Sequence, residues 1–132
     1  MRTSPLVVGF DLDMTLIDTV PGFGAVLVAL GDELGVVFPV EDMVARLGPP
    51  LETLLAGHLA EEAIAPAGDR FRELYPDHAI TTVPVLAGAH EAIAAVRRHA
   101  GRVLIVTGKF PRNAELHVEH LALDVDLVEG WV

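Results

Sequence analysis

The sequence predicts an α/β fold in which a parallel sheet is interrupted, after its first strand, by a helical segment. Two short apolar runs, residues 5–10 and 102–108, each end in polar residues, which is typical of strands buried in a parallel sheet. In the second half of the chain, helical and extended patterns alternate, as they do in parallel α/β folds. Residues 20–83 instead carry helical patterns with little strand signal.

The composition indicates a single globular domain and excludes several classes of protein. The chain has 132 residues, of which 52% are hydrophobic, so it can bury a modest core and is too apolar to be disordered. A net charge of −10 argues against a nucleic-acid partner. No apolar run reaches the roughly 20 residues of a membrane helix, and no signal peptide is evident. The absence of cysteine excludes disulfides and thiolate metal sites, and it fits a cytoplasmic protein.

Apolar spacing, together with glycine and proline residues that end helices, predicts four helices in the central segment. They cover residues 21–35, 39–50, 51–64 and 68–78. After an extended, proline-broken link over 80–88, we expect a helix, a strand, a helix and a strand. These elements cover residues 89–101, 102–108, 111–123 and 125–130. The acids around the last strand, Asp124, Asp126 and Glu129, are expected to be solvated.

Polar side chains follow the first two predicted strands. Asp11 and Asp13 end the first strand, and Thr107 ends the second. Residues two apart in an extended segment face the same side, so the two carboxylates can converge on one point at the edge where ligands collect. A divalent cation would relieve their repulsion, and Mg²⁺ prefers such oxygen ligands together with a substrate phosphate. Thr107 could then donate a hydrogen bond to a phosphate oxygen.

Asp-x-Asp on its own is also a common turn or helix-cap pattern. Three features of its setting favour the metal and phosphate interpretation instead: the apolar strand before it, Thr15 two residues after it, and the second strand that ends in Thr-Gly.

The same residues resemble a known family. GFDLDMTLIDT, residues 9–19, resembles motif I (Asp-x-Asp-x-Thr) of the haloacid dehalogenase-like hydrolase superfamily, and VLIVTGK, residues 103–109, resembles its motif II. The helical segment resembles the inserted cap of the phosphoglycolate phosphatase-like branch. The resemblance implies a Rossmann-like parallel core formed by residues 1–18 and 84–132, with a helical cap over 19–83. It also implies a Mg²⁺-dependent phosphoric monoester hydrolase that acts on a small phosphorylated metabolite.

The resemblance further implies roles for individual residues. Asp11 would be the nucleophile that forms an aspartyl-phosphate, and Asp13 would protonate the leaving oxygen and later activate water. Mg²⁺ would be bound by the Asp11 side chain and the Asp13 backbone carbonyl. Thr107 would hold the transferring phosphoryl group, and Thr15 would support the loop. Arg46 lies where that branch often places a substrate-contacting loop.

Some positions depart from the pattern or leave alternatives open. Met14 stands where the family most often has glycine, and we expect it to affect the turn after the carboxylates. Asp18 is expected to be a helix N-cap at the start of the cap. His117 and His120 have a spacing that could bind a metal, but with no third ligand evident they are expected to be surface histidines.

Two further motifs of the family have no counterpart in the sequence. These are a lysine that neutralises charge around the nucleophile, and Gly-Asp-x-x-x-Asp, which completes the metal site. Lys109 could supply the positive charge and contact the phosphate, or it could be an ordinary loop lysine. We therefore expect the chain to be part of a longer enzyme, with little phosphatase activity alone and with Val7–Phe10 as an exposed apolar edge.

Two alternative functions remain open at this level. One is a phosphosugar mutase of the same fold, in which a second sugar hydroxyl accepts the covalent phosphate. The other is a catalytically dead domain that binds phosphate or a partner chain, and a homodimer burying Val7–Phe10 would be one form of it.

Overall fold

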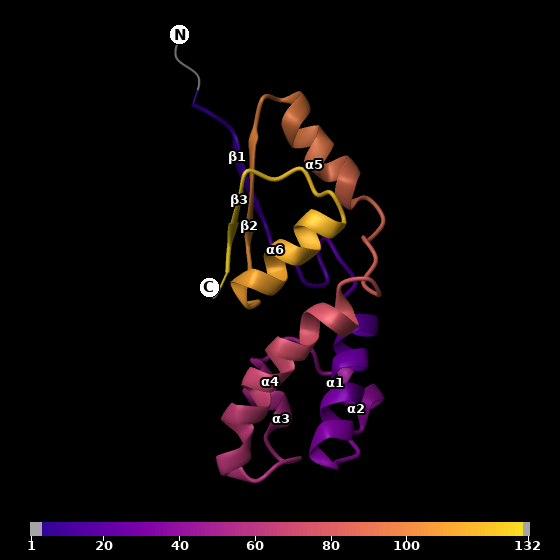
Figure 1. The fold of residues 1–132 in the computed structure, drawn as a ribbon. Coiled ribbons are helices and arrows are strands. Elements are labelled where there is room, and N and C mark those ends of the chain that lie inside the picture. The colour runs from indigo at the N-terminus through magenta and orange to yellow at the C-terminus, as the bar shows by residue number, and fades with distance from the viewer. Residues whose placement is uncertain (1–3, 131–132) are drawn as a thin grey trace. The chain divides into compact units, whose positions relative to one another are not determined.

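The computed structural model describes residues 4–130, which divide into two compact units (Figure 1). One unit comprises the described residues of Met1–Thr19 and Pro84–Val132, and the other is Val20–Val83. The chain thus leaves the first unit after its first strand and returns to it before the helix of residues 89–98. We describe each unit by itself.

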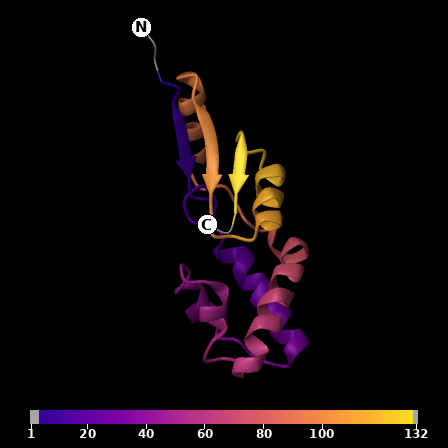
Figure 2. The ribbon, with the colours of Figure 1, turned by 90° about the vertical axis from the view of Figure 1, so that its left-hand side faces the viewer.

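The first unit is a three-stranded parallel sheet with two helices. The strands, in the spatial order β1-β2-β3, are Val7–Phe10, Arg102–Val106 and Leu127–Glu129. The helices are α5 (Ala89–Arg98), which packs on β2, and α6 (Pro111–His120), which packs on β3. Both helices lie on the same side of the sheet (Figures 1 and 2). The predicted α/β class with a parallel sheet and an inserted helical segment is confirmed.

The strand register explains which side chains enter the core. Val8 pairs with Val103 and Phe10 with Ile105, and this set of residues faces the helices; Val103 and Ile105 are fully buried. The alternate residues point to the other face, where Val7 is 50% exposed. The prediction from the apolar pattern alone that the first strand is buried is wrong. Within residues 4–130 the strand lies at the edge of the sheet and helices cover one of its faces, which confirms the expectation that Val7–Phe10 forms an exposed apolar edge.

Arg97, in the last turn of α5, forms ion pairs with two aspartates that precede β3. The Arg97 guanidinium lies 3.1 Å from Asp124 and 2.7 Å from Asp126. Asp126 also accepts a hydrogen bond from the Val103 N–H (2.8 Å), and these contacts, the arginine first, lower its pKa. Asp126 is exposed, as predicted for a solvated strand end, but it also links α5 and β2 to the start of β3, which the sequence did not indicate.

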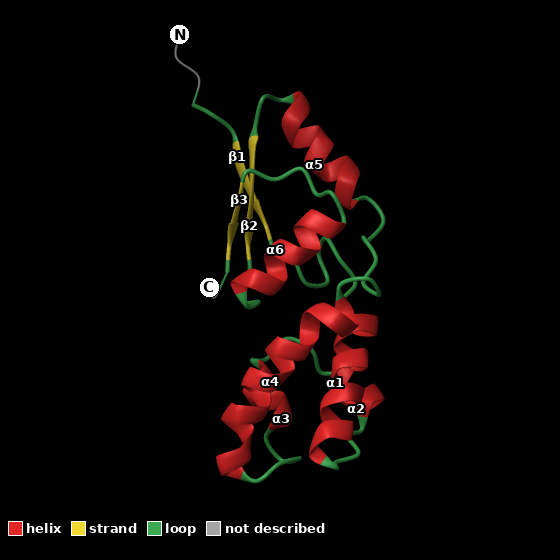
Figure 3. Ribbon diagram, in the orientation of Figure 1, coloured by secondary structure: helices red, strands yellow, loops and turns green. Residues whose placement is uncertain are grey.

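The second unit is entirely helical (Figure 3). Its helices are α1 (Val20–Leu34), α2 (Val40–Val44), α3 (Leu51–Leu55) and α4 (Glu61–Ala79). The main contact is between α1 and α4, where the Phe23 and Phe71 rings pack with centroids 4.7 Å apart and Tyr75 extends the aromatic cluster. No helix within residues 4–130 is long and apolar enough to cross a membrane.

The boundaries between the third and fourth helices differ from prediction. The helix expected over 51–64 stops at Leu55, and a single helix, α4, runs from Glu61 through Pro66 to Ala79. Pro66 costs α4 one backbone hydrogen bond. The burial of Ala67, Phe71 and Leu74 offsets that cost, because packing against a neighbouring helix outweighs local propensity.

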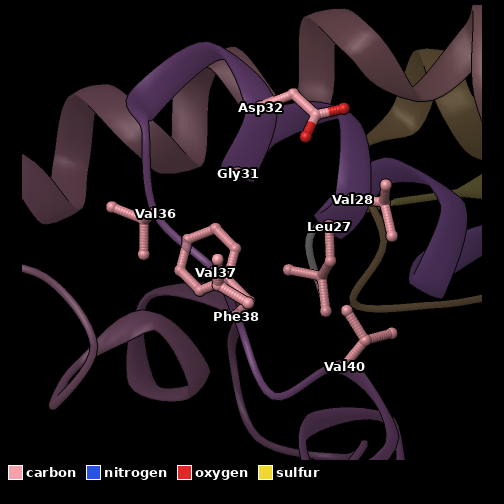
Figure 4. Close-up of a pocket in the computed structure, with 8 residues that line it drawn as sticks. All are labelled: Leu27, Val28, Gly31, Asp32, Val36, Val37, Phe38 and Val40. Carbon is pink, nitrogen blue, oxygen red and sulfur yellow. The ribbon is translucent and has the colours of Figure 1, made fainter.

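Gly31 allows the chain after α1 to fold back onto it. The Val36 N–H donates to the Gly31 carbonyl (2.9 Å), and the Val36 carbonyl lies so close that a Cβ at position 31 would be 2.5 Å from it. Figure 4 shows the mostly apolar residues that line a pocket at this turn. Its residues are Leu27, Val28, Gly31, Asp32, Val36, Val37, Phe38 and Val40.

Gly31→Ala should therefore lower the free energy of unfolding by about 2 kcal/mol, because a backbone oxygen cannot give way as a side chain can. Gly24→Ala is the matched control in the same helix, since its Cβ would meet side-chain atoms and no backbone, namely Val40 Cγ1 at 3.3 Å and Val44 Cγ1 at 3.9 Å. The control should change stability by less than about 1 kcal/mol. Denaturant unfolding of both variants checks this, and equal effects would contradict the steric account.

Candidate active site

The loop after β1 holds the two carboxylates. The Leu12 carbonyl accepts hydrogen bonds from the backbone N–H groups of Thr15, Leu16 and Ile17, at 3.0 to 3.2 Å. Because Leu12, Leu16 and Ile17 are buried, this turn is anchored in the core. Asp11 is exposed and its Oδ1 accepts the Leu12 N–H at 2.8 Å. The backbone thus presents the carboxylates from a fixed support.

Thr107 and Lys109 follow the neighbouring strand, β2. Thr107 is buried; its N–H donates to the Glu129 carbonyl (2.9 Å), and its Oγ1 accepts the Lys109 N–H (3.1 Å). The Lys109 ammonium lies 3.0 Å from Asp13 Oδ1, and the lysine side chain is only 11% exposed. The structure therefore brings Lys109 and Asp13 together at the carboxyl ends of two adjacent strands.

The charges in this region are unbalanced. Asp11 and Asp13 supply two negative charges, and Lys109 supplies one positive charge that is largely shielded from solvent. A largely buried ammonium is costly unless an anion pairs with it, so the lysine and Asp13 stabilise each other. The remaining negative charge is compatible with a bound cation.

The carboxylates of Asp11 and Asp13 are oxygen ligands of the kind that bind Mg²⁺. Mg²⁺ is usually held by one or two carboxylates, with water and substrate phosphate as the other ligands. Asp11 and Asp13 are of that type, whereas no cluster of three or more histidine, aspartate or glutamate side chains with metal-binding geometry occurs within residues 4–130.

Met14 occupies an unusual backbone conformation. Its φ is +60°, in the left-handed region where glycine is favoured, and its side chain is exposed. Its N–H nevertheless donates to the Ile17 carbonyl at 2.8 Å, so the turn is closed by hydrogen bonds despite the residue type. Methionine thus carries a conformational cost in the loop that holds the carboxylates.

Among the other residues that the sequence indicated, Thr15 and Asp18 form backbone hydrogen bonds in this unit, and Arg46 belongs to the other unit. Thr15 is exposed, and its N–H bond to Leu12 is part of the turn. Helix α1 begins at Val20, two residues after Asp18, and the Asp18 N–H donates to the Pro84 carbonyl at 3.0 Å; the role of Asp18 as the N-cap stays a prediction. Arg46 belongs to the other unit, where it is exposed and lies 3.3 Å from Asp42.

Two buried polar residues on α6 were not expected. His117 has no exposed surface and Asn113 is buried one helical turn before it, so the prediction that His117 is a surface residue is wrong. Burial, together with the charges of Lys109 and His120, lowers the pKa of His117 to about 3. The helical spacing of these residues could have indicated their burial. Asn113, Ala114 and His117 share one face of the helix, and that face is turned to the sheet.

Met14→Gly should raise the free energy of unfolding by about 1 kcal/mol, because glycine has no steric penalty at positive φ. Ala94→Gly, at an exposed position inside α5, is the control and should lower stability by a similar amount. In urea titrations, the two substitutions should change the free energy of unfolding in opposite directions. A Met14→Gly variant that is less stable than the native chain would contradict this account, because the packing of the methionine side chain would then outweigh the strain.

His117 should make the protein less stable in acid. The unfolded chain takes up a proton on this histidine near pH 6.5, whereas the folded chain resists protonation until about pH 3. The contribution of neutral His117 to the free energy of unfolding is therefore complete above pH 6.5. It is lost as the pH falls towards 3, by at most about 1.4 kcal/mol per pH unit. His117→Leu should flatten the pH dependence of the melting temperature between these limits, and His120→Leu should not.

Solved structures share this fold over nearly the whole chain. The chain matches a haloacid dehalogenase-like family hydrolase from Streptococcus pneumoniae with 25% identity and a TM-score of 0.83, covering 96% of this chain and 61% of that one. Protein Tyrosine Kinase A from Mycobacterium tuberculosis matches with 25% identity and a TM-score of 0.81, covering 98% and 61%. A predicted phosphoglycolate phosphatase from Haemophilus somnus, at 16% identity and a TM-score of 0.78 over 96% of this chain and 62% of that one, shares the fold alone.

The chain thus spans less than two thirds of the length of these three structures. A comparison with curated protein sequences found no match. The sequence profile of the haloacid dehalogenase-like hydrolases, in contrast, matches residues 8–127, which include both aspartates, Thr107 and Lys109. This match confirms the family that the two motifs resemble. The chain belongs to the haloacid dehalogenase-like hydrolase family.

Proposed function

We propose that this chain provides the nucleophile, the general acid and the phosphate-binding groups of a Mg²⁺-dependent phosphoric monoester hydrolase. The observation that supports it most is the pairing of Lys109 with Asp13 beside Asp11 and Thr107, at the carboxyl ends of β1 and β2. Carboxylates, a hydroxyl and an ammonium at that edge of a parallel sheet are the groups that phosphoryl transfer requires.

In the first step, the Asp11 carboxylate attacks the phosphorus atom and the bond from phosphorus to the ester oxygen breaks. Asp13 must enter this step in its protonated form; it gives that proton to the oxygen, so an alcohol leaves, an aspartyl-phosphate forms and Asp13 becomes the carboxylate that can pair with Lys109. In the second step, Asp13 takes a proton from water while the water oxygen attacks phosphorus. This releases inorganic phosphate and restores the Asp11 carboxylate.

Lys109 and Thr107 hold the phosphoryl group through these steps. The Lys109 ammonium faces Asp13 in the structure, and a phosphoryl group bound next to Asp13 would give it a second anionic partner. Asp11 and Asp13 are the residues that would hold Mg²⁺, and when bound it would neutralise charge on the carboxylates and the phosphate. Thr15 supports the loop through its place in the turn around Leu12.

The helical unit, Val20–Val83, is proposed to act as a cap that selects a small phosphorylated metabolite as substrate. It is inserted between β1, which ends at the carboxylates, and the segment that leads to β2. A cap in that position can exclude water from the reacting phosphoryl group. Arg46, exposed in this unit, is the proposed substrate contact.

Asp11→Asn should abolish formation of the covalent intermediate. Beryllium trifluoride with Mg²⁺ forms a stable mimic of aspartyl-phosphate, and its fluorine NMR signal reports the adduct without requiring turnover. We expect an Mg²⁺-dependent bound signal in the native chain and none in Asp11→Asn. Where p-nitrophenyl phosphate turnover is measurable, the same variant should lose about 10³-fold or more.

Asp32→Asn is the matched control, because it makes the same change in charge at an exposed acid of the helical unit. It should retain both the adduct and the turnover. An Asp11→Asn variant that still forms the adduct would overturn the assignment of the nucleophile, and a native chain that forms none would overturn the proposed function.

A further inference from the structure

The loop between β2 and α6 carries Thr107 and Lys109, and the end of β3 holds this loop in place. Val106 and Glu129 are the last paired residues of β2 and β3. One residue further along the loop, the Thr107 N–H donates to the Glu129 carbonyl at 2.9 Å, and Thr107 Oγ1 accepts the Lys109 N–H at 3.1 Å. The loop, residues 107–110, is thus tied to β3 at its first residue.

Gly130, directly after β3, packs against the backbone at the far end of the same loop. A Cβ atom at position 130 would lie 2.8 Å from Pro111 Cγ, 2.9 Å from Pro111 Cα and 2.9 Å from the Lys109 carbonyl oxygen. Two of these atoms belong to the backbone and the third to a ring, so none of them can rotate away. The φ of Gly130 lies outside the left-handed region. Glycine is therefore needed here for space and not for its backbone conformation.

We propose that Gly130 is a positioning residue for Lys109: because it has no side chain, the end of β3 can seat the loop where the lysine ammonium meets Asp13. That ammonium lies 3.0 Å from Asp13 Oδ1. A side chain at position 130 would push the Lys109 carbonyl and the first residue of α6 away from β3, and the lysine would move with its backbone. The inference rests on the proposed function for the role of Lys109, and it extends that site to a residue after β3.

The lysine side chain has little freedom to absorb such a displacement. It is only 11% exposed, so the surrounding atoms restrict the rotamers that could restore the contact with Asp13. The displacement would also act on the hydrogen bond between the Lys109 N–H and Thr107 Oγ1, and so on the hydroxyl proposed to hold the phosphoryl group. A misplacement of about 1 Å at a reacting site can cost about 10²-fold in rate.

Gly101 provides a matched control, because a purely structural glycine would affect stability alone. Gly101 belongs to the same unit and directly precedes β2, at the end of that strand away from the loop. A Cβ atom at position 101 would lie 2.5 Å from Val96 Cγ1 and 2.9 Å from the Val96 carbonyl oxygen. Gly101→Ala therefore creates a comparable clash with a backbone oxygen, without touching the segment that carries Lys109.

NMR of the lysine side chain tests the position of Lys109 without requiring any activity. Lys109 is the only lysine in the sequence, so a chain labelled with ¹³C-lysine gives a single Cε signal. Gly130→Ala should move this signal towards its position in the urea-unfolded chain. The same variant should be acetylated several-fold faster at Lys109 by N-hydroxysuccinimide acetate, as measured by mass spectrometry. Gly101→Ala should lower the melting temperature to a similar extent and should leave both lysine measurements unchanged.

Binding of the aspartyl-phosphate mimic connects the position of Lys109 to the proposed function. Gly130→Ala should weaken the Mg²⁺-dependent beryllium trifluoride adduct at least about tenfold, and Gly101→Ala should weaken it less than about twofold. A native chain that forms no adduct would overturn the proposed function, whereas the lysine signal and the acetylation rate would still test the role of Gly130. The two failures are therefore distinguishable.

A Gly130→Ala chain whose lysine signal and acetylation rate match those of Gly101→Ala would overturn the inference. Pro111→Ala is a second variant for the case in which Gly130→Ala does not fold. It removes the ring atom that faces Gly130 and introduces no clash, and the first position of a helix accepts alanine. It should also speed acetylation of Lys109, and an unchanged rate in this variant would equally overturn the inference.

Discussion

The parallel pairing of β1 with β2 is the constraint on which the candidate site depends. Val8 opposite Val103 and Phe10 opposite Ile105 set a register in which both strands end at the same level. Only then can Asp13, after the first strand, meet Lys109, after the second, across a distance of 3.0 Å. A shift of one residue would also exchange the buried and exposed faces of β2, so the apolar core and the site geometry are fixed by the same hydrogen bonds.

Much of the fold could be predicted from the sequence, because its signals are local. The apolar runs, the helix-ending glycines and the Asp-x-Asp-x-Thr pattern each lie within a few residues, and they identified the strands, the helical insertion and the two carboxylates. The family followed from these motifs. What the sequence could not reveal was set by contacts between distant segments. Pro66 suggests a helix boundary, yet α4 continues through it because its apolar face packs on α1.

The same reasoning applies to charged and polar residues. Lys109 could equally have been a loop lysine, and only the sheet register shows that its ammonium reaches Asp13. His117 and Asn113 are polar and so suggest a surface, but their helical spacing places them on the face of α6 that packs on the sheet. Burying polar groups is costly. The charge of Lys109 acts on His117 and contributes, after burial, to the lowering of its pKa, so this buried histidine is coupled electrostatically to the candidate site.

Within residues 4–130, β1 is an edge strand, and this has a consequence for the behaviour of the described chain in solution. A short edge strand with an exposed valine is a template on which further strands can add. Proline and charge, which commonly block such growth, are absent from the four residues of the strand and occur only beside it, at Pro5 and Asp11. The net charge of −10 also opposes association, through repulsion between whole molecules. Near the isoelectric point of about 4.8 this repulsion is lost, so the edge is then least protected against aggregation.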